Sequence, residues 1–235
     1  MSGGRNRRIG QGDLVVPVLF KPLLAILLLA TACGCSDQKP ASASTQAATD
    51  SPAARVDWMA MAAFWERSSA LAGIDTGPAD AEKRMLVYFD PNCPVCAQQW
   101  AVLRPYMDRV RIRWIPVAYQ DASSVKRAAG LLSASDPVAA LAVNEQAFDF
   151  ATGKGGYLPE REPPASAIEQ VQRNTRSAMK AGDLTGTPTL GFELMRGQRY
   201  YRMVGLLEGE AVRVAVGDLG TTRDPWAKRG GEVRN

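Results

Sequence analysis

The chain contains no histidine among its 235 residues, and it has only four cysteines. The lack of histidine excludes Ser-His-Asp and Cys-His catalysis, histidine-ligated metal sites and histidine proton relays. Positive charge is only slightly in excess, with a formal net charge of +4. Because no stripe of basic residues with interleaved aromatic residues is present, nucleic-acid binding has no support. The cysteines form two close pairs, Cys33/Cys35 and Cys93/Cys96, a spacing that indicates chemistry rather than core packing.

The first 32 residues have the pattern of an export signal. Arginines precede a short apolar run at residues 22–31, and small residues follow it. The run is about half the ~20 residues that a membrane-spanning helix needs, so a permanent anchor is the weaker interpretation. The segment Leu29–Cys33 is similar to the bacterial lipobox, which predicts a lipid on Cys33, with Cys35 as the weaker acceptor. Ordinary signal cleavage before Cys33, without a lipid, is the alternative.

Composition and charge change after this signal. Residues 1–32 hold four basic residues and one acidic residue, so the remainder has 24 basic and 23 acidic residues and is close to neutral. Residues 33–55 are small and polar and contain proline, a composition that predicts a disordered tether. With two or more acyl chains on Cys33, the tether would hold a folded domain stably at a membrane.

The rest of the chain predicts an α/β domain preceded by a helix. Apolar residues at helical spacing predict a packing or linker helix within 56–78, running from Val56 to Ala72 with Asp57 as its cap. The α/β domain is expected over 79–222, with a helical insert at about 121–182, and a tail over 223–235. Within the domain the patterns predict strands at 85–89 and 112–118, a helix at 97–108 between them, two helices in 121–150, a loop at 153–164, a helix at 165–181, a hairpin of strands 189–193 and 200–204, and a helix at 208–216.

The motif Cys93-Pro94-Val95-Cys96 directly follows a predicted buried strand and opens a predicted helix. Unpaired N–H groups and the dipole of a helix N-terminus favour a thiolate at Cys93, which would be the nucleophile. Pro94 suits the first helical turn because its missing N–H would be unpaired there anyway. Cys96, one turn later, would attack a mixed disulfide at Cys93 and release the partner. We expect Cys96 to be the more buried cysteine and to react second.

Three other uses of this cysteine pair stay open. A zinc site needs two further ligands, which Cys33 and Cys35 would have to supply. Copper binding would need a methionine, of which the chain has eight. A structural disulfide is the third alternative, although a two-residue spacing at a helix start is an unusual place for one. We expect no metal, and no cofactor beyond a redox-active Cys93–Cys96 disulfide.

A second motif, Gly186-Thr187-Pro188, precedes a predicted strand far along the chain. Together with Cys-Pro-Val-Cys in this order, it resembles the thioredoxin superfamily, in which a cis-proline loop faces the cysteine pair. The residues Asp90-Pro91-Asn92 before Cys93 and Arg104-Pro105 after it resemble the DsbC/DsbG group of periplasmic thiol:disulfide interchange proteins, and are closest to DsbG. The resemblance implies an α/β, thioredoxin-like fold with a helical insertion between the Cys-x-x-Cys helix and the cis-Pro loop.

The resemblance also implies how the site works and where. Thr187 and Pro188 would hold an extended substrate backbone, and Pro94 and Val95 would contact the substrate and tune the redox potential. The implied activity is reductase or isomerase work on exported proteins with cysteines, in the periplasm of a Gram-negative bacterium, with an inner-membrane electron donor of the DsbD type. Nothing in the tether resembles the dimerisation domain of that group, and we therefore expect this chain to be a monomer. The alternatives are a disulfide-donating oxidase and a non-enzymatic metal-binding or assembly module on the same fold.

Overall fold

The structure is a computed structural model, and it describes residues 56–218. The predicted signal, the lipid on Cys33, the tether and the C-terminal tail lie outside these residues and stay predictions. No helix in the described range is long and apolar enough to span a lipid bilayer. In chain order the elements are α1 (Trp58–Ser69), β1 (Ile74–Thr76), β2 (Lys83–Phe89), α2 (Pro94–Leu103), a 3-10 turn (Arg104–Tyr106), β3 (Val110–Pro116), α3 (Ala122–Leu132), α4 (Pro137–Gln146), α5 (Ala165–Lys180), β4 (Thr189–Met195), β5 (Arg199–Val204) and α6 (Gly209–Ala215).

The strands form one mixed sheet in the order β1-β3-β2-β4-β5. Strand β2 is central, lying parallel to β3 and antiparallel to β4, and the edge strands β1 and β5 both pair antiparallel with their neighbours. All residues from Met85 to Phe89 are buried, which explains why this strand is a continuous apolar run rather than an alternating one. A strand in this position needs cover on both faces of the sheet.

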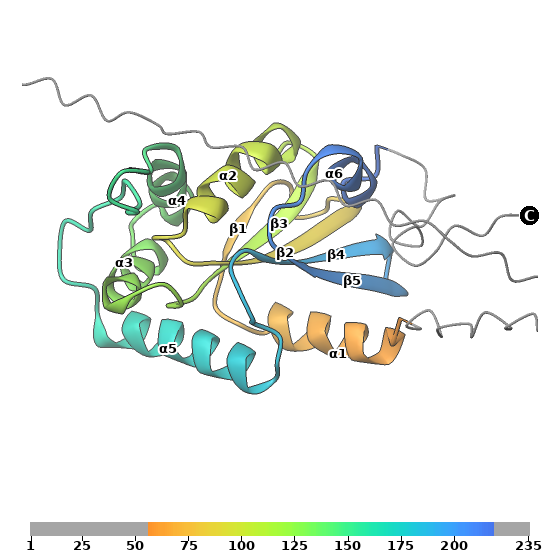
Figure 1. The fold of residues 1–235 in the computed structure, drawn as a ribbon, viewed down its shortest axis with the longest axis horizontal. Coiled ribbons are helices and arrows are strands. Elements are labelled where there is room, and N and C mark those ends of the chain that lie inside the picture. The colour runs from red at the N-terminus through yellow and green to blue at the C-terminus, as the bar shows by residue number, and fades with distance from the viewer. Residues whose placement is uncertain (1–55, 219–235) are drawn as a thin grey trace, which may run out of the picture. The chain divides into compact units, whose positions relative to one another are not determined.

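Helices supply that cover on the two faces, with α1 and α5 below the sheet and α2 and α6 above it in the view of Figure 1. Met85 and Val87 pack in the larger apolar cluster, which also contains residues of α2, α4 and α6. Leu86 and Tyr88 pack on the opposite face, in a cluster with Phe64 of α1. The alternation of side chains along β2 therefore divides the apolar core into two layers.

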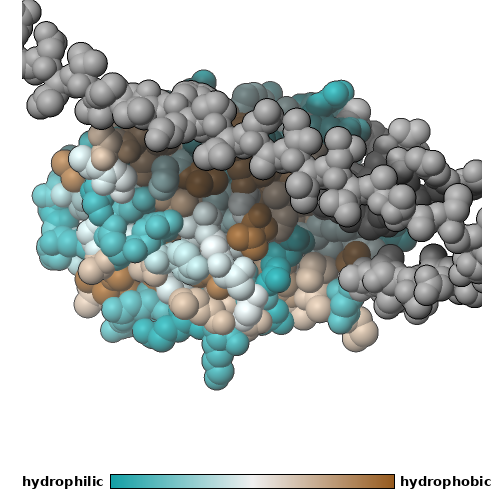
Figure 2. All heavy atoms as spheres, in the orientation of Figure 1, coloured by the Kyte–Doolittle hydropathy of each residue, from teal (hydrophilic) through white to brown (hydrophobic). Residues whose placement is uncertain are grey.

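Helix α5 shows how the surface layer is built. Its buried residues are Ala167, Val171, Asn174 and Ala178, a spacing of three and four that forms one stripe along the helix. Most of the remaining positions are exposed, and Figure 2 shows hydrophilic side chains over this helix with scattered hydrophobic ones among them. Helices α3, α4 and α5 all lie between β3 and β4 in the chain. That they form an insertion into a smaller fold stays a prediction.

Two expectations from the sequence are corrected by the structure. Residues 74–76, in the stretch 56–78 where only a helix was expected, form strand β1 and pair antiparallel with β3. The pairing with β3 defines this strand, and a three-residue pattern in the sequence cannot reveal it. The helix after the cysteine pair ends at Leu103 rather than residue 108. A 3-10 turn containing Pro105 follows, since proline has no N–H to continue the α-helix. The other predicted helices and strands are present near their expected places.

Candidate active site

Cys93 is the N-cap residue of α2, directly after the loop that leaves β2. Its backbone is extended, with φ −95° and ψ 117°, and its carbonyl oxygen accepts hydrogen bonds from the N–H groups of Cys96 at 3.0 Å and Ala97 at 3.2 Å. Pro94 follows in the first helical turn and is exposed, and Val95 is half-buried. The prediction that the cysteine pair opens a helix is confirmed.

The Thr187–Pro188 peptide bond is cis, as predicted, and it lies beside the cysteine pair. The Sγ atom of Cys93 is 3.3 Å from the carbonyl oxygen of Thr187, to which the thiol donates. The carbonyl oxygen of Pro188 accepts a 2.8 Å hydrogen bond from the N–H of Gly205, which fixes the loop against the end of β5. The structure thus brings together all six residues that the sequence placed in the domain's site, with Cys93 in direct contact with the cis-Pro loop.

The pKa values of the two thiols shift in opposite directions. A hydrogen bond from the Cys96 side chain, helped by the Thr187 side chain and by two backbone N–H groups at the start of α2, lowers the pKa of Cys93 to about 6 against the opposing effect of burial. Burial, the same contact with Cys93 and nearby negative charge raise the pKa of Cys96 well above its ordinary value. Neither cysteine is in a disulfide, and their exposed fractions are 1% and 0%, so the predicted difference in burial is small. This difference in pKa is the one expected of a nucleophilic Cys93 and a resolving Cys96.

A buried carboxyl group lies near these thiols and was not found from the sequence. Glu145 of α4 is buried, and burial raises its pKa to about 8, with the charges of Cys93 and Asp90 adding to the effect. The charge of Glu145 in turn raises the pKa of Cys96. In the sequence this glutamate is one of several in a helical segment, and no spacing rule connects it to the cysteine pair.

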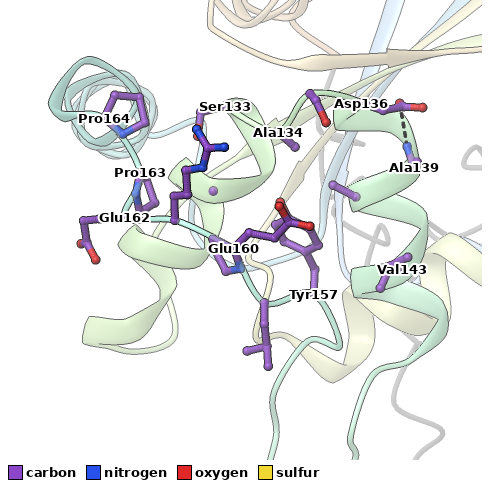
Figure 3. Close-up of a pocket in the computed structure, with 16 residues that line it drawn as sticks. Ser133, Ala134, Asp136, Ala139, Val143, Tyr157, Glu160, Glu162, Pro163 and Pro164 are labelled. Atoms are coloured by element: carbon purple, nitrogen blue, oxygen red, sulfur yellow. Dashed lines mark hydrogen bonds between the residues drawn. The ribbon is translucent and has the colours of Figure 1, made fainter.

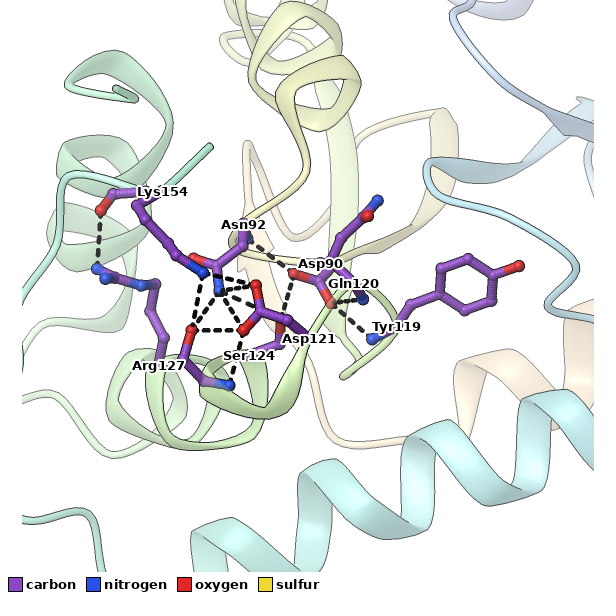
Figure 4. Close-up of polar contacts among 10 residues, drawn as sticks. Asp90, Asn92, Tyr119, Gln120, Asp121, Ser124, Arg127 and Lys154 are labelled. Atoms are coloured by element: carbon purple, nitrogen blue, oxygen red, sulfur yellow. Dashed lines mark hydrogen bonds and ion pairs between the residues drawn. The ribbon is translucent and has the colours of Figure 1, made fainter. Parts of the chain in front are cut away.

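Asp90, three residues before Cys93, organises the loops around the site (Figure 4). One carboxylate oxygen accepts hydrogen bonds from the N–H groups of Tyr119 at 2.6 Å and Gln120 at 2.8 Å. The other accepts from the N–H of Asn92 and from the hydroxyl of Ser124, each at 2.8 Å. Four donors therefore satisfy a carboxylate whose pKa burial raises, and they join the loop after β2 to the loop after β3.

Beside this carboxylate, Asn92 and Asp121 continue the network toward the surface (Figure 4). The side-chain amide of Asn92 donates to the Ser123 hydroxyl at 2.9 Å, and Lys154 forms a 2.6 Å ion pair with Asp121. That ion pair and the Ser123 hydroxyl lower the pKa of Asp121 to about 2. These contacts pin the residues between β3 and α3 next to the cysteine loop.

Tyr119 and Gln120 extend from this network to the cis-Pro loop. The Tyr119 hydroxyl donates to the carbonyl oxygen of Thr185 at 2.9 Å, and the Gln120 amide nitrogen is 3.5 Å from the Thr187 hydroxyl. Both side chains are exposed, so they border the space in front of Thr187. The sequence analysis missed them, because a loop without a motif gives no signal of its neighbours in space.

A separate hollow of about 610 Å³ lies between the α3–α4 turn and the loop at 157–164 (Figure 3). Its lining includes Val143, Leu158, Pro159 and Glu160, and none of the predicted site residues. Over residues 56–218, no group of three or more cysteine, aspartate and glutamate side chains is placed to hold a metal ion.

Comparison with known proteins finds two curated relatives that share one name. No protein-family model matches the chain. The chain is 33% identical over 129 residues to the thiol:disulfide interchange protein DsbG of Pseudomonas aeruginosa, covering 54% of this chain and 48% of that protein. It is 26% identical over 159 residues to DsbG of Escherichia coli, covering 66% of this chain and 61% of that protein. The chain therefore spans between about half and three fifths of the length of these relatives.

Solved structures support the fold. The catalytic domain of Proteus mirabilis ScsC superimposes with a TM-score of 0.54 at 20% sequence identity, covering 68% of this chain and 96% of that one. A periplasmic thioredoxin-like protein from Salmonella enterica serovar Typhimurium superimposes with a TM-score of 0.50 at 20% identity, covering 63% and 89%. The α/β, thioredoxin-like fold and the similarity to DsbG, both expected from the two motifs, are confirmed.

Proposed function

We propose that this chain, thioredoxin-like in fold and similar to DsbG in sequence, is a thiol:disulfide oxidoreductase that reduces disulfides in exported proteins of the periplasm. The observation that carries the proposal is the Cys93 thiol at the N-terminus of α2, with a pKa of about 6 and its Sγ atom beside the cis Thr187–Pro188 bond. Thiolates at such sites are nucleophiles near neutral pH. No cofactor is needed beyond the Cys93–Cys96 pair.

The reaction follows from the difference between the two thiols. The Cys93 thiolate attacks one sulfur of a substrate disulfide, forming a mixed disulfide and releasing the other substrate sulfur as a thiolate. Cys96, after losing its proton, attacks the Cys93 sulfur and closes the Cys93–Cys96 disulfide. The second substrate sulfur leaves as a thiolate, so two electrons have passed from the protein to the substrate. A membrane donor of the DsbD type would then restore the dithiol.

The substrate would lie across the cis-Pro loop. In our proposal Thr187 and Pro188 hold an extended segment of its backbone, while Pro94 and Val95 form the surface beside the reacting sulfur. Support comes from the exposed position of Pro94, the half-buried positions of Val95 and Thr187, and the contact between Thr187 and Cys93.

Reduction of insulin disulfides tests the proposal with Cys93→Ser and Cys96→Ser. We expect Cys93→Ser to lose activity completely, because no nucleophile is left. Cys96→Ser should accumulate a mixed disulfide through Cys93, which mass spectrometry of the intact protein detects. Full activity in both variants would end the proposal, provided that thermal melting shows both to be folded.

The direction of transfer depends on the reduction potential of the pair. Equilibration with glutathione measures it, and the redox state of the protein in cells can be read beside it by thiol labelling. A potential near about −120 mV would favour the alternative of a disulfide-donating oxidase, since strong oxidants have such values. We expect a more negative potential and a reduced pair in cells. We also expect a monomer by sedimentation, which favours a reductase over an isomerase that needs a dimer.

Cys33 supplies the proposed attachment to the membrane. We propose that its lipid holds the domain at the periplasmic face through the tether at 33–55. Expression of the full chain in a Gram-negative host with a radiolabelled fatty acid tests this. Label should enter the wild-type protein and be absent from Cys33→Ser, and label retained in Cys33→Ser but lost in Cys35→Ser would move the lipid to Cys35. No label in any form of the protein would leave ordinary signal cleavage as the explanation.

A further inference from the structure

Glu145 is a buried carboxyl group of which one oxygen atom accepts a hydrogen bond and the other has no partner among the described residues. Its exposed fraction is 4%, and within residues 56–218 its Oε2 atom has no hydrogen-bond partner. Its Oε1 atom accepts a 2.9 Å hydrogen bond from the side-chain amide of Asn144. A carboxylate charge in such a place is costly, whereas a protonated carboxyl is tolerated. The group is therefore poised to hold a proton.

Asn144 connects this carboxyl group to the cysteine loop. The same amide nitrogen that donates to Glu145 also donates to the carbonyl oxygen of Pro91 at 3.0 Å, two residues before Cys93. Helix α4 packs on α2, and its residues Ala140 and Leu141 share the core cluster of Cys93 and Cys96. Asn144 and the apolar residues of α4 thus hold the helix segment that carries Glu145 against the loop and the helix that carry the dithiol.

Few charged groups lie on the elements around Glu145. Helix α3, which also packs on α4, carries the half-buried Arg127, whose guanidinium donates to the carbonyl oxygens of Gly155 and Tyr157. On the side of α2 there are the Cys93 thiolate and the Cys96 thiol, and on the loop after β2 there is Asp90. Asp90 accepts four hydrogen bonds and has no unused position to take a proton without losing one. Strand β2 itself contributes no acidic residue. Glu145 is consequently the carboxyl group in this part of the molecule that can change its protonation when the charge on Cys93 changes.

We propose that Glu145 takes up a proton when the Cys93–Cys96 disulfide is reduced and releases it when the disulfide forms again. The inference rests on the proposed function, because it concerns the same redox reaction. A donor dithiol gives two electrons and two protons and becomes a disulfide. The Cys93–Cys96 bond breaks, Cys93 becomes a thiolate, one proton binds Cys96 and the other binds Glu145. The buried acid balances the new negative charge on Cys93, so helix α4 links the reduction potential to pH.

The physical reason is repulsion between like charges in a dry environment. The thiolate of reduced Cys93 disfavours a charge on Glu145, and this repulsion contributes to the raised pKa of the carboxyl group. In the oxidised protein the two sulfurs are neutral, so that contribution disappears and the pKa of Glu145 falls. Between these two values, reduction is accompanied by net proton uptake at this residue.

The direct test is an NMR titration of the Glu145 side-chain carboxyl carbon in oxidised and in reduced wild-type protein. We expect a higher midpoint in the reduced protein than in the oxidised protein. Equal midpoints in the two states, or a midpoint in the normal range for glutamate in both, would overturn the inference. This measurement needs no variant and therefore does not depend on whether a substitution disturbs folding.

The second test is the pH dependence of the equilibrium with glutathione for wild type and Glu145→Gln, with the exposed Glu169→Gln on α5 as a matched control. Between the two Glu145 midpoints, uptake of the extra proton should make the pH dependence of the wild-type equilibrium constant steeper by up to tenfold per pH unit. In the reduction potential this is about 30 mV per pH unit. Glu145→Gln should lose this extra slope, and Glu169→Gln should keep it. If Glu145→Gln kept the wild-type pH dependence, the inference would be wrong, although the proposed disulfide exchange would remain supported. If wild type formed no Cys93–Cys96 disulfide at all, the proposed function would fail instead.

Discussion

The Sγ atom of Cys93 lies 3.3 Å from the carbonyl oxygen of Thr187, although the two residues are 94 positions apart. The sheet explains this meeting, because Tyr88 of β2 pairs with Thr189 of β4. The segment that follows β2 and the segment that precedes β4 therefore lie at the same end of the sheet. Helix α2 begins at that end of the sheet, with its N-terminus at the cis-Pro loop, so one pair of strands positions both the proposed nucleophile and the backbone proposed to hold the substrate.

Replacing Thr187 with valine should weaken the acidity of Cys93. The substitution keeps the β-branched shape and removes the hydroxyl, which helps to lower the pKa of Cys93 to about 6. We expect this pKa to rise, so that the thiolate fraction at pH 6 falls below about half, while reactivity at pH 9 changes little. Alkylation rates with iodoacetamide from pH 4 to 9 measure the shift. Thr185→Val, at an exposed position two residues away, is the control and should leave the profile unchanged.

The sequence predicted the parts of this site that belong to local patterns. Cys93 and Pro94 carry their own signal, since a Cys-x-x-Cys after an apolar run marks a strand, a turn and a helix start. The Thr187–Pro188 loop became informative only through its resemblance to a known superfamily, and the similarity of the fold to thioredoxin-like structures agrees with that interpretation.

The residues that join these parts could not be predicted in this way. The carboxyl group of Glu145 and the loop at Tyr119 reach the site through packing of α4 on α2 and through hydrogen bonds to Asp90. Such contacts depend on how distant elements meet, and one sequence holds no periodicity that encodes them. Strand β1 was missed for the same reason, because its three residues are defined by pairing with β3.

The network around Asp90 predicts a large difference between two Asp-to-Asn substitutions. In Asp90→Asn one of the two oxygens becomes an NH2 group and meets donors instead of accepting from them, so we expect a loss of about 2–4 kcal/mol in the free energy of unfolding. Asp121→Asn loses a partly exposed ion pair with Lys154 but keeps a good N-cap for α3, and should cost less than about 1 kcal/mol. Urea denaturation at pH 7 measures both, and equal losses would contradict the role assigned to Asp90.

Gly155 should tolerate no side chain because it lies against the back of the cysteine loop. A Cβ atom there would be 2.1 Å from Oδ1 of Asn144 and 2.4 Å from the carbonyl oxygen of Pro91. We expect Gly155→Ala to destabilise the protein by about 1–3 kcal/mol and to slow insulin reduction by displacing Pro91. Gly153→Ala is the control: its φ of +65° adds backbone strain, but no atom lies within 4 Å of its Cβ, so activity should persist. A slowed reaction in both variants would show that the contact with Pro91 is not the cause.

The buried acid Glu145 should make the folded protein lose stability as pH rises. Its pKa is about 8 in the folded state and near 4.5 when unfolded, so the folded state holds the proton more tightly, and unfolding is increasingly favoured between these values. Cys93 acts in the opposite sense from about pH 6 upward, because its pKa is lowered on folding. The difference between reduced wild type and reduced Glu145→Gln cancels that contribution. We expect Glu145→Gln to gain on wild type as pH rises from 5, reaching an advantage of about 2–4 kcal/mol near pH 7.5, since one pKa unit is worth about 1.4 kcal/mol. Urea denaturation of both proteins across this range measures the gain, and a constant offset between the two curves would mean that Glu145 does not titrate where the structure places its pKa.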